Sequence, residues 1–329
     1  MLTAMAAGRP KDVTRLICAS VSRVEGSVMD QLFRIRDSLA LREEPRRVHG
    51  ALLHASGWFV LWMEGSAEDV EGERERAARD PRNSHQLVIH RSVGPALLDE
   101  PFVAVAAQGT DTPSAFARRI HRVRDTFGRG ERQDPAQAWK QLQSPCLLDD
   151  GRDAWRLPQR LVAMVAATDT PSVDILRKLG DRFDTPVVYQ RFAGPQSRTI
   201  DAGVTYVDIP NGAQVHRVRL LSRRAVGRPM LRRCLGTADA FVVLVGERPS
   251  AAVSLAATVA TAVRALPAEV VVYLVARTGT VACSFARLLQ NSAGPALVQR
   301  LVAMPEDRLV DIVLGMAQQD RPAGSREAA

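Results

Sequence analysis

The second half of the chain alternates near-continuous apolar runs with helical patterns, and this feature constrains its fold more than any other. Four such runs lie at residues 160–167, 204–210, 239–247 and 269–277. Runs of this kind are typical of central parallel strands whose two faces are both covered by helices. The intervening sequence has helical spacing, as in SLAATVATAVRAL at residues 254–266. The pattern predicts a doubly wound α/β domain over residues 157–320.

The first half of the chain has a different order of elements. TRLICAS predicts a strand, SVMDQLFRIRDSLAL a helix, VHGALLHASGWFVLWMEG two strands with a turn at residues 55–57, SAEDVEGERERAARD a helix and HQLVIHRSV a strand. The order β-α-β-β-α-β predicts an α+β, ferredoxin-like domain over residues 12–128. Polar breaks predict a linker over residues 129–156.

Composition limits the classes of partner. The net charge is +8, but the basic residues are spread along the chain and aromatic residues make up only 5%, which argues against a nucleic-acid surface. No apolar run approaches the roughly 18 residues that a membrane span needs, so we expect no membrane insertion. The start of the chain lacks a secretory pattern, which predicts a cytoplasmic protein. The four cysteines are widely separated and predict neither a disulfide framework nor a metal site.

The run WFVLWMEG at residues 58–65 carries two tryptophans within one predicted strand. Side chains alternate along a strand, so Trp58 and Trp62 share one face, and Phe59 and Leu61 share the other. We expect core on one face, and an interface or a covering helix on the other.

Four pieces of the first half, in order and spacing, resemble BLUF domains, the blue-light sensors that use FAD. The pieces are LICAS, HGALL, GWFVLWMEG and ARDPRNSHQ. In that family a tyrosine, an asparagine and a glutamine around the flavin ring carry the light response. Here Cys18 stands at the tyrosine position, Glu43 or Glu44 at the asparagine position and Leu61 at the glutamine position. Because leucine can neither donate nor accept a hydrogen bond, the resemblance implies that this domain does not respond to light.

The resemblance places further side chains at the flavin pocket. Arg76 and Asp80 stand at the positions of a basic residue and an aspartate beside the flavin, and His49 replaces a threonine. Arg76 and Asp80 are also spaced as an exposed i,i+4 ion pair, which is the alternative interpretation. The family further implies FAD as a possible cofactor and pairing of two copies as a possible homodimer.

Residues 160 to about 318 resemble a small GTPase that has lost its nucleotide motifs. VTYVDIPNG is similar to the strand and D-x-x-G turn of that family, with Asp208 at the aspartate and Gly212 one place late. The expected phosphate-binding loop reads AATDTPSVD, without glycine or lysine, and Asp169 would repel phosphate. The resemblance implies a degenerate nucleotide site at Asp169, Asp208 and Gly212 and no hydrolysis. Asp208 can alternatively cap the turn that follows its strand.

No G-x-S-x-G, H-E-x-x-H or cluster of His, Cys and Asp occurs, so the sequence predicts no catalytic residue, no metal and no enzymatic activity. We therefore expect a non-enzymatic signalling or scaffold protein that responds to no light, holds no cofactor and acts through contacts with protein partners. Two alternatives remain open. The first domain can be an FAD-binding light or redox sensor, and the second a nucleotide switch or an enzyme with its site near Asp169 and Asp208.

Overall fold

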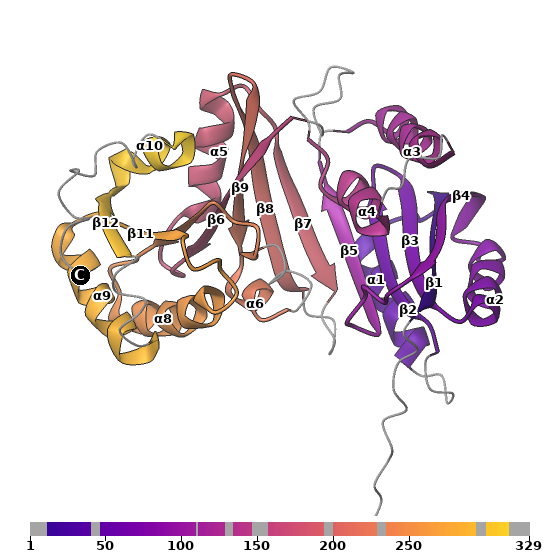
Figure 1. Ribbon diagram of the computed structural model, residues 1–329, viewed down its shortest axis with the longest axis horizontal. Coiled ribbons are helices and arrows are strands. Elements are labelled where there is room, and N and C mark those ends of the chain that lie inside the picture. The colour runs from indigo at the N-terminus through magenta and orange to yellow at the C-terminus, as the bar shows by residue number, and fades with distance from the viewer. Residues whose placement is uncertain are drawn as a thin grey trace, which may run out of the picture. The chain divides into compact units, whose positions relative to one another are not determined.

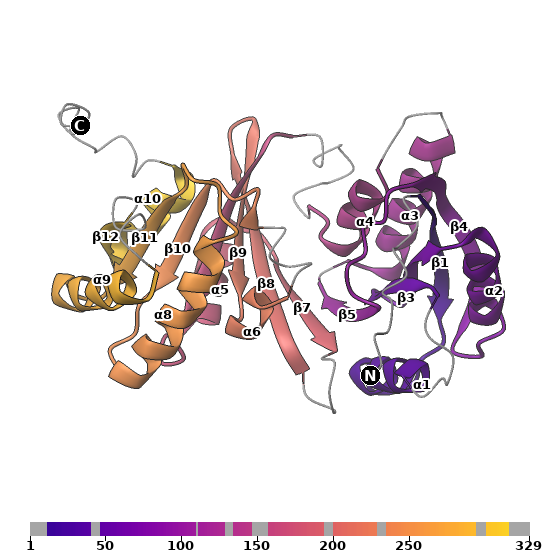
Figure 2. The ribbon, with the colours of Figure 1, turned by 60° about the horizontal axis from the view of Figure 1, so that its bottom comes forward.

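The computed structural model describes residues 12–40, 47–109, 111–128, 134–146, 157–193, 200–228, 235–293 and 301–315 (Figures 1 and 2). The chain divides into two compact units. The first unit comprises residues 1–145 and 192–199, and the second comprises residues 146–191 and 200–329. No helix in these ranges combines the length and the hydropathy that a membrane span requires.

The first unit has the ferredoxin-like order that the sequence predicts, with one strand added. Its elements are β1 (Val13–Ser22), α1 (Val28–Ala40), β2 (His49–Ala55), β3 (Trp58–Gly65), α2 (Ala67–Ala78), β4 (Asn83–Gly94), β5 (Phe102–Gln108), α3 (Pro113–Gly128) and α4 (Pro135–Gln143). The sheet order is β5-β2-β3-β1-β4. β5 pairs parallel with β2, and the other pairs are antiparallel.

The turn between β2 and β3 fixes the register of this sheet. Ser56 and Gly57 have φ angles of 48° and 76°, the left-handed pair that a tight hairpin requires, and Ala55 lies opposite Trp58. This turn confirms the prediction at residues 55–57. The register also sets which side chains of β3 share a face.

Helices cover both faces of the first sheet, with α1 and α4 on opposite sides (Figure 2). Under α1, Leu32 packs with Leu52 and Phe59. On the other face Trp62 contacts Trp139 of α4, with 5.8 Å between the ring centroids. The two faces of β3 therefore carry the side chains that the sequence predicts, and a helix covers the face with the tryptophans.

The second unit is a mixed sheet with helices on both faces. Its elements are β6 (Gln159–Ala166), α5 (Ser172–Arg182), β7 (Val187–Ala193), β8 (Ile200–Asn211), β9 (Gln214–Leu221), α6 (Arg223–Val226), β10 (Ala240–Leu244), α8 (Pro249–Val263), β11 (Val271–Ala276), α9 (Gly279–Ala293), β12 (Leu301–Pro305), a 3-10 turn (Glu306–Arg308) and α10 (Leu309–Leu314). The strand order is β12-β11-β10-β6-β9-β8-β7. β8 runs antiparallel to β9, whereas β9, β6, β10, β11 and β12 are parallel.

The core of the second unit lies between its sheet and the helices that cover one face. Alternate side chains of β6 and β10, such as Met164 and Val242, pack with Leu176 of α5 and Ile312 of α10. Helices α8 and α9 lie on the opposite face (Figure 1). The doubly wound layering matches the sequence prediction, except that β8 breaks the parallel order.

Candidate functional site

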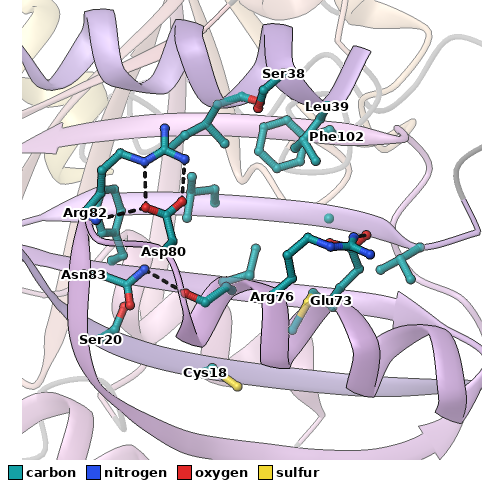
Figure 3. Close-up of a pocket in the computed structure, with 18 of the residues that line it drawn as sticks. Cys18, Ser20, Ser38, Leu39, Glu73, Arg76, Asp80, Arg82, Asn83 and Phe102 are labelled. Carbon is teal, nitrogen blue, oxygen red and sulfur yellow. Dashed lines mark hydrogen bonds and ion pairs between the residues drawn. The ribbon is translucent and has the colours of Figure 1, made fainter. Parts of the chain in front are cut away.

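The first unit contains an open cavity between α1, α2 and the sheet (Figure 3). Its volume is about 170 Å³. The sheet supplies an apolar floor that includes Cys18, Leu52, Phe59, Leu61 and Met63. Ile35 and Leu39 of α1 form one wall, and the end of α2 with the start of β4 forms a polar wall of Glu73, Arg76, Asp80, Arg82, Asn83 and Gln86.

Cys18 and Leu61 lie side by side on the cavity floor. They are opposite residues in the β1–β3 ladder, and both line the cavity. The Cys18 side chain packs with Leu16, Met63 and Val70 and is 2% exposed. Burial raises the pKa of the Cys18 thiol to about 12, so the thiol stays neutral at physiological pH. This part of the floor therefore offers a ligand no charge.

The polar wall carries an ion pair that the sequence did not predict. The Arg82 guanidinium Nε donates to Asp80 Oδ1 at 2.8 Å, and the Arg82 backbone N–H donates to the same oxygen at 2.9 Å. The hydrogen bonds and charge of Arg82 hold the pKa of Asp80 below its usual value. Arg76 instead pairs with Glu73, one turn earlier on α2. The predicted i,i+4 pair of Arg76 and Asp80 is wrong, because α2 ends at Ala78, before Asp80.

Asn83 presents an unused acceptor at the cavity. Its Nδ2 donates to the Ala77 carbonyl at 3.0 Å, which fixes the side chain against the end of α2. Its Oδ1 is buried and has no hydrogen-bond partner in the described parts of the chain. A buried oxygen without a donor costs free energy, so this oxygen can accept a hydrogen bond from a ligand or from a water. Sequence reasoning missed Asn83, although it stands in the quoted piece ARDPRNSHQ.

The structure brings four of the predicted flavin-pocket residues together. Cys18, Leu61, Arg76 and Asp80 all line the cavity. His49 is not among its lining residues, and the His49 Nδ1 lies 3.0 Å from the Glu100 carbonyl oxygen. Glu43 and Glu44 lie outside the described residues.

Asp208 in the second unit is part of a buried ion pair. It lies opposite Arg217 in the β8–β9 ladder, and the guanidinium donates to both carboxylate oxygens at 2.7 and 2.8 Å. Burial lowers the pKa of Arg217, but the adjacent Asp208 carboxylate outweighs burial and the net shift is upward. Asp208 therefore does not cap the following turn, and it holds Arg217 inside the sheet.

Asp169 and Gly212 do not lie in one site. Gly212 has φ 58° at the tip of the β8–β9 hairpin, and the neighbouring Val215 pairs with Gln159 at the start of β6. Asp169 follows the other end of β6. The three residues predicted as one degenerate nucleotide site thus fall at different levels of the sheet, because the strand that contains Asp208 runs antiparallel to β6.

The first unit is thus an α+β domain with a cavity between two helices and one face of its sheet. Residues 13–95 match the family model described as "Sensors of blue-light using FAD", or BLUF. The first unit therefore contains a BLUF domain, as the sequence resemblance indicated. The comparison with curated proteins gave no match.

Several solved structures are similar to the chain at low identity. "BlrB - a BLUF protein, dark state structure" is 20% identical, with 39% of this chain and 96% of that chain covered and a TM-score of 0.28. "Klebsiella pneumoniae BlrP1 pH 8.0 calcium/cy-diGMP complex" is 18% identical, with 86% and 74% covered and a TM-score of 0.26. A bacterial light-regulated adenylyl cyclase is 9% identical, with 63% and 78% covered and a TM-score of 0.27.

These comparisons correct one sequence prediction and leave a second without support. The matched structures include an enzyme, the light-regulated adenylyl cyclase. The prediction that excluded enzymatic activity for this chain is therefore wrong, and we do not retain it. The predicted likeness of the second unit to a small GTPase finds no support in the matches, because the family model ends at residue 95.

FAD is the cofactor that the BLUF family name implies. The cavity of about 170 Å³ is smaller than the roughly 300 Å³ of a typical ligand pocket, so the fit concerns the kinds of side chain that line it. The apolar floor and the α1 wall suit a flat ring system, and the free Asn83 Oδ1 suits an N–H at the edge of such a ring. Arg76 lies on the polar wall with its side chain 57% exposed and paired with Glu73, and a guanidinium there can also meet a phosphate. These features suit binding of a flavin. They do not supply the light response of the family, because the floor at Cys18 and Leu61 has no amide that could exchange hydrogen bonds with the ring.

Proposed function

We propose that the chain is a signalling protein of the blue-light sensor class that holds FAD in the first unit but does not respond to light. The cavity that brings Cys18, Leu61, Arg76 and Asp80 together carries this proposal. Bound FAD would supply absorption of blue light and redox chemistry. The protein would act on its partners according to whether the cavity is filled.

Each wall of the cavity has a distinct part in holding the ligand. Ile35 and Leu39 of α1 exclude water from one side of the ring, and Asn83 Oδ1 accepts a hydrogen bond from the ring edge. Arg76 binds phosphate at the cavity mouth. Asp80 keeps Arg82 in place through their paired hydrogen bonds.

The floor of the cavity is the reason for the lost light response. A light-driven exchange of hydrogen bonds needs a side chain with both a donor and an acceptor beside the ring. Leu61 has neither, and the Cys18 thiol opposite it is a weak donor with a pKa of about 12. The signal therefore rests on binding of the ligand, which stabilises the folded first unit by mass action.

Filling the cavity with a large side chain tests the proposal. Ala77 lines the cavity, whereas its neighbour Ala78 is exposed on the same helix. Ala77→Trp should abolish FAD binding, measured by quenching of flavin fluorescence, while Ala78→Trp should bind as the wild type does. Equal FAD affinity for the two variants would show that FAD binds elsewhere.

The proposal of protein partners also depends on whether the cavity of the first unit is filled. We infer that the filled first unit contacts another protein, and that a second copy of the chain is one candidate. Light scattering measures the molar mass of the protein in solution with and without FAD. A change in mass that depends on FAD requires a contact between copies that depends on FAD. An unchanged mass in both states would exclude the second copy as the partner.

A further inference from the structure

The polar wall of the cavity in the first unit balances its own charges. Among the lining residues that the structure describes, the positive ones are Arg76 and Arg82 and the negative ones are Glu73 and Asp80. Arg76 pairs with Glu73, and Arg82 pairs with Asp80 (Figure 3). Each guanidinium that lines the cavity therefore has a carboxylate beside it, and these four side chains together carry no net charge.

The floor of the cavity adds no charge either. It is built from apolar side chains such as Leu52, Phe59 and Leu61. The thiol of Cys18 stays protonated, because burial raises its pKa to about 12. A charge that enters such a surface gives up contacts with water and gains no partner of opposite sign. The described cavity residues therefore favour a neutral group over an ion.

A flavin ring changes its charge when it is reduced. The oxidised ring is neutral at physiological pH, whereas uptake of two electrons and one proton leaves a negative charge on the ring. Proteins tune this couple through the charges that they place beside the ring. A cavity whose arginines are already paired gives the anion little compensation for its lost hydration. Such a cavity should bind the oxidised ring more tightly than the reduced one.

We propose that the cavity selects the oxidised form of FAD and empties when the flavin is reduced. This inference rests on the proposed function, because it takes FAD as the ligand. It goes further by naming what controls occupancy. The reduction takes place outside the cavity, with a reduced nicotinamide as the donor. The nicotinamide passes a hydride to the flavin, so that its C–H bond breaks, an N–H bond forms on the ring, and the products are oxidised nicotinamide and anionic reduced flavin.

Glu73 is the residue that sets this preference on the α2 side of the cavity. Its carboxylate lines the cavity and neutralises Arg76 one turn later on the same helix. Without Glu73, Arg76 would leave a positive charge at the cavity that an anionic ring could use. Since the pair is partly exposed, its loss should disturb folding little.

Equilibrium dialysis of the full-length protein under anaerobic conditions tests the proposal. At pH 8 and low ionic strength, FAD reduced with dithionite should bind at least about tenfold more weakly than oxidised FAD, which corresponds to a midpoint potential lowered by about 30 mV. The ratio of the two dissociation constants is the quantity to compare. It cancels the contribution of the adenosine diphosphate part, which both forms share.

Lowering the pH separates charge from shape. At pH 6 the reduced ring takes up a second proton and becomes neutral, so the ratio should fall. The ionisable side chains that line the cavity in the described ranges are those of Cys18, Glu73, Arg76, Asp80 and Arg82, and none is a histidine that would titrate between pH 6 and 8. A change in the ratio over this range therefore reports the charge of the ring.

Glu73→Gln tests the part of the wall. It should lower the ratio at pH 8 by at least about threefold, because the charge of Arg76 then favours the anion. Glu75→Gln is the matched control, since Glu75 lies on the same helix, pairs with Arg79 at the surface and is not among the cavity residues. It removes the same charge and should keep the ratio of the wild type.

The outcomes separate this inference from the proposed function. If oxidised FAD binds but reduced FAD binds as tightly at pH 8, the inference is overturned and the proposed function stands. The same holds if Glu73→Gln changes the ratio no more than Glu75→Gln does. If oxidised FAD does not bind at all, the proposed function fails and the inference fails with it.

Discussion

Cys18 and Leu61 face each other across β1 and β3, and both reach the floor of the cavity between α1 and α2. These are the two described positions at which the BLUF resemblance implies side chains for the light response. The pair is apolar and neutral, with the Cys18 thiol held protonated by burial. At these two positions the cavity therefore lacks the hydrogen-bonding side chains on which our proposal of a light-insensitive domain depends.

Asn83 should contribute measurably to FAD binding. Asn83→Ala removes the unused Oδ1 acceptor and should weaken FAD binding by about tenfold, near 1.4 kcal/mol, which is typical of one buried hydrogen bond. Asn83→Asp keeps an acceptor oxygen but loses the Nδ2–H that donates to the Ala77 carbonyl, so its affinity for FAD should also fall below that of the wild type. Fluorescence titration with FAD checks both, and equal affinities for the wild type and Asn83→Ala would exclude this contact.

His54 should make the first unit less stable in acid. Burial lowers the pKa of His54 to about 4 from an ordinary value of 6.5. Between these values the unfolded chain binds a proton that the folded chain does not, so stability falls as pH drops from about 6.5 to 4. His54→Gln should flatten this part of the profile of Tm against pH, whereas His121→Gln, at an exposed position, should not. Identical profiles for His54→Gln and the wild type would contradict the assignment.

The buried pair of Asp208 and Arg217 should matter for folding. Asp208→Ala leaves the Arg217 charge buried without its carboxylate and should cost about 3–5 kcal/mol of unfolding free energy. Replacing both residues, as in Asp208→Leu with Arg217→Met, should cost less than Asp208→Ala alone. Denaturant unfolding of the wild type and of these two variants measures the order of stability, and a double variant less stable than Asp208→Ala would refute the prediction.

Gly246 and Asp169 should be coupled energetically. Gly246→Ala puts a methyl group against the Asp169 carboxylate and should destabilise the second unit by about 1–3 kcal/mol. In an Asp169→Ala background the same change should cost clearly less, because the clashing atoms are gone. A double-mutant cycle of unfolding free energies gives the coupling. Additive effects would mean that the two residues do not touch.

Most of the strands could be predicted where apolar spacing alone decides the element. The β2–β3 hairpin followed from its turn residues, and β6, β10 and β11 followed from their apolar runs. β9 reads QVHRVRLL and was missed, because its arginines indicate a surface. Arg217 is nevertheless buried, since Asp208 on the neighbouring strand neutralises it. Such a pairing depends on strand register, which a single sequence does not reveal.

The two candidate sites differ in how far the sequence predicts them. Cys18, Leu61, Arg76 and Asp80 line one cavity, because several motifs of the first half keep their spacing, and their role as flavin-pocket residues stays a prediction. Asp169 and Gly212 were grouped by a resemblance to the phosphate-binding loop and the D-x-x-G turn of a small GTPase, and the antiparallel β8 separates them. A motif on one strand therefore locates a site only when the strand direction is known as well.

The visible absorption spectrum of the protein after incubation with FAD, before and after blue light, tests the central claim most directly. The account predicts flavin bands that remain with the protein through gel filtration and do not shift to the red on illumination. A red shift after blue light would contradict the claim that Cys18 and Leu61 silence the domain. Absence of flavin bands at saturating FAD would contradict the claim that the cavity holds a flavin.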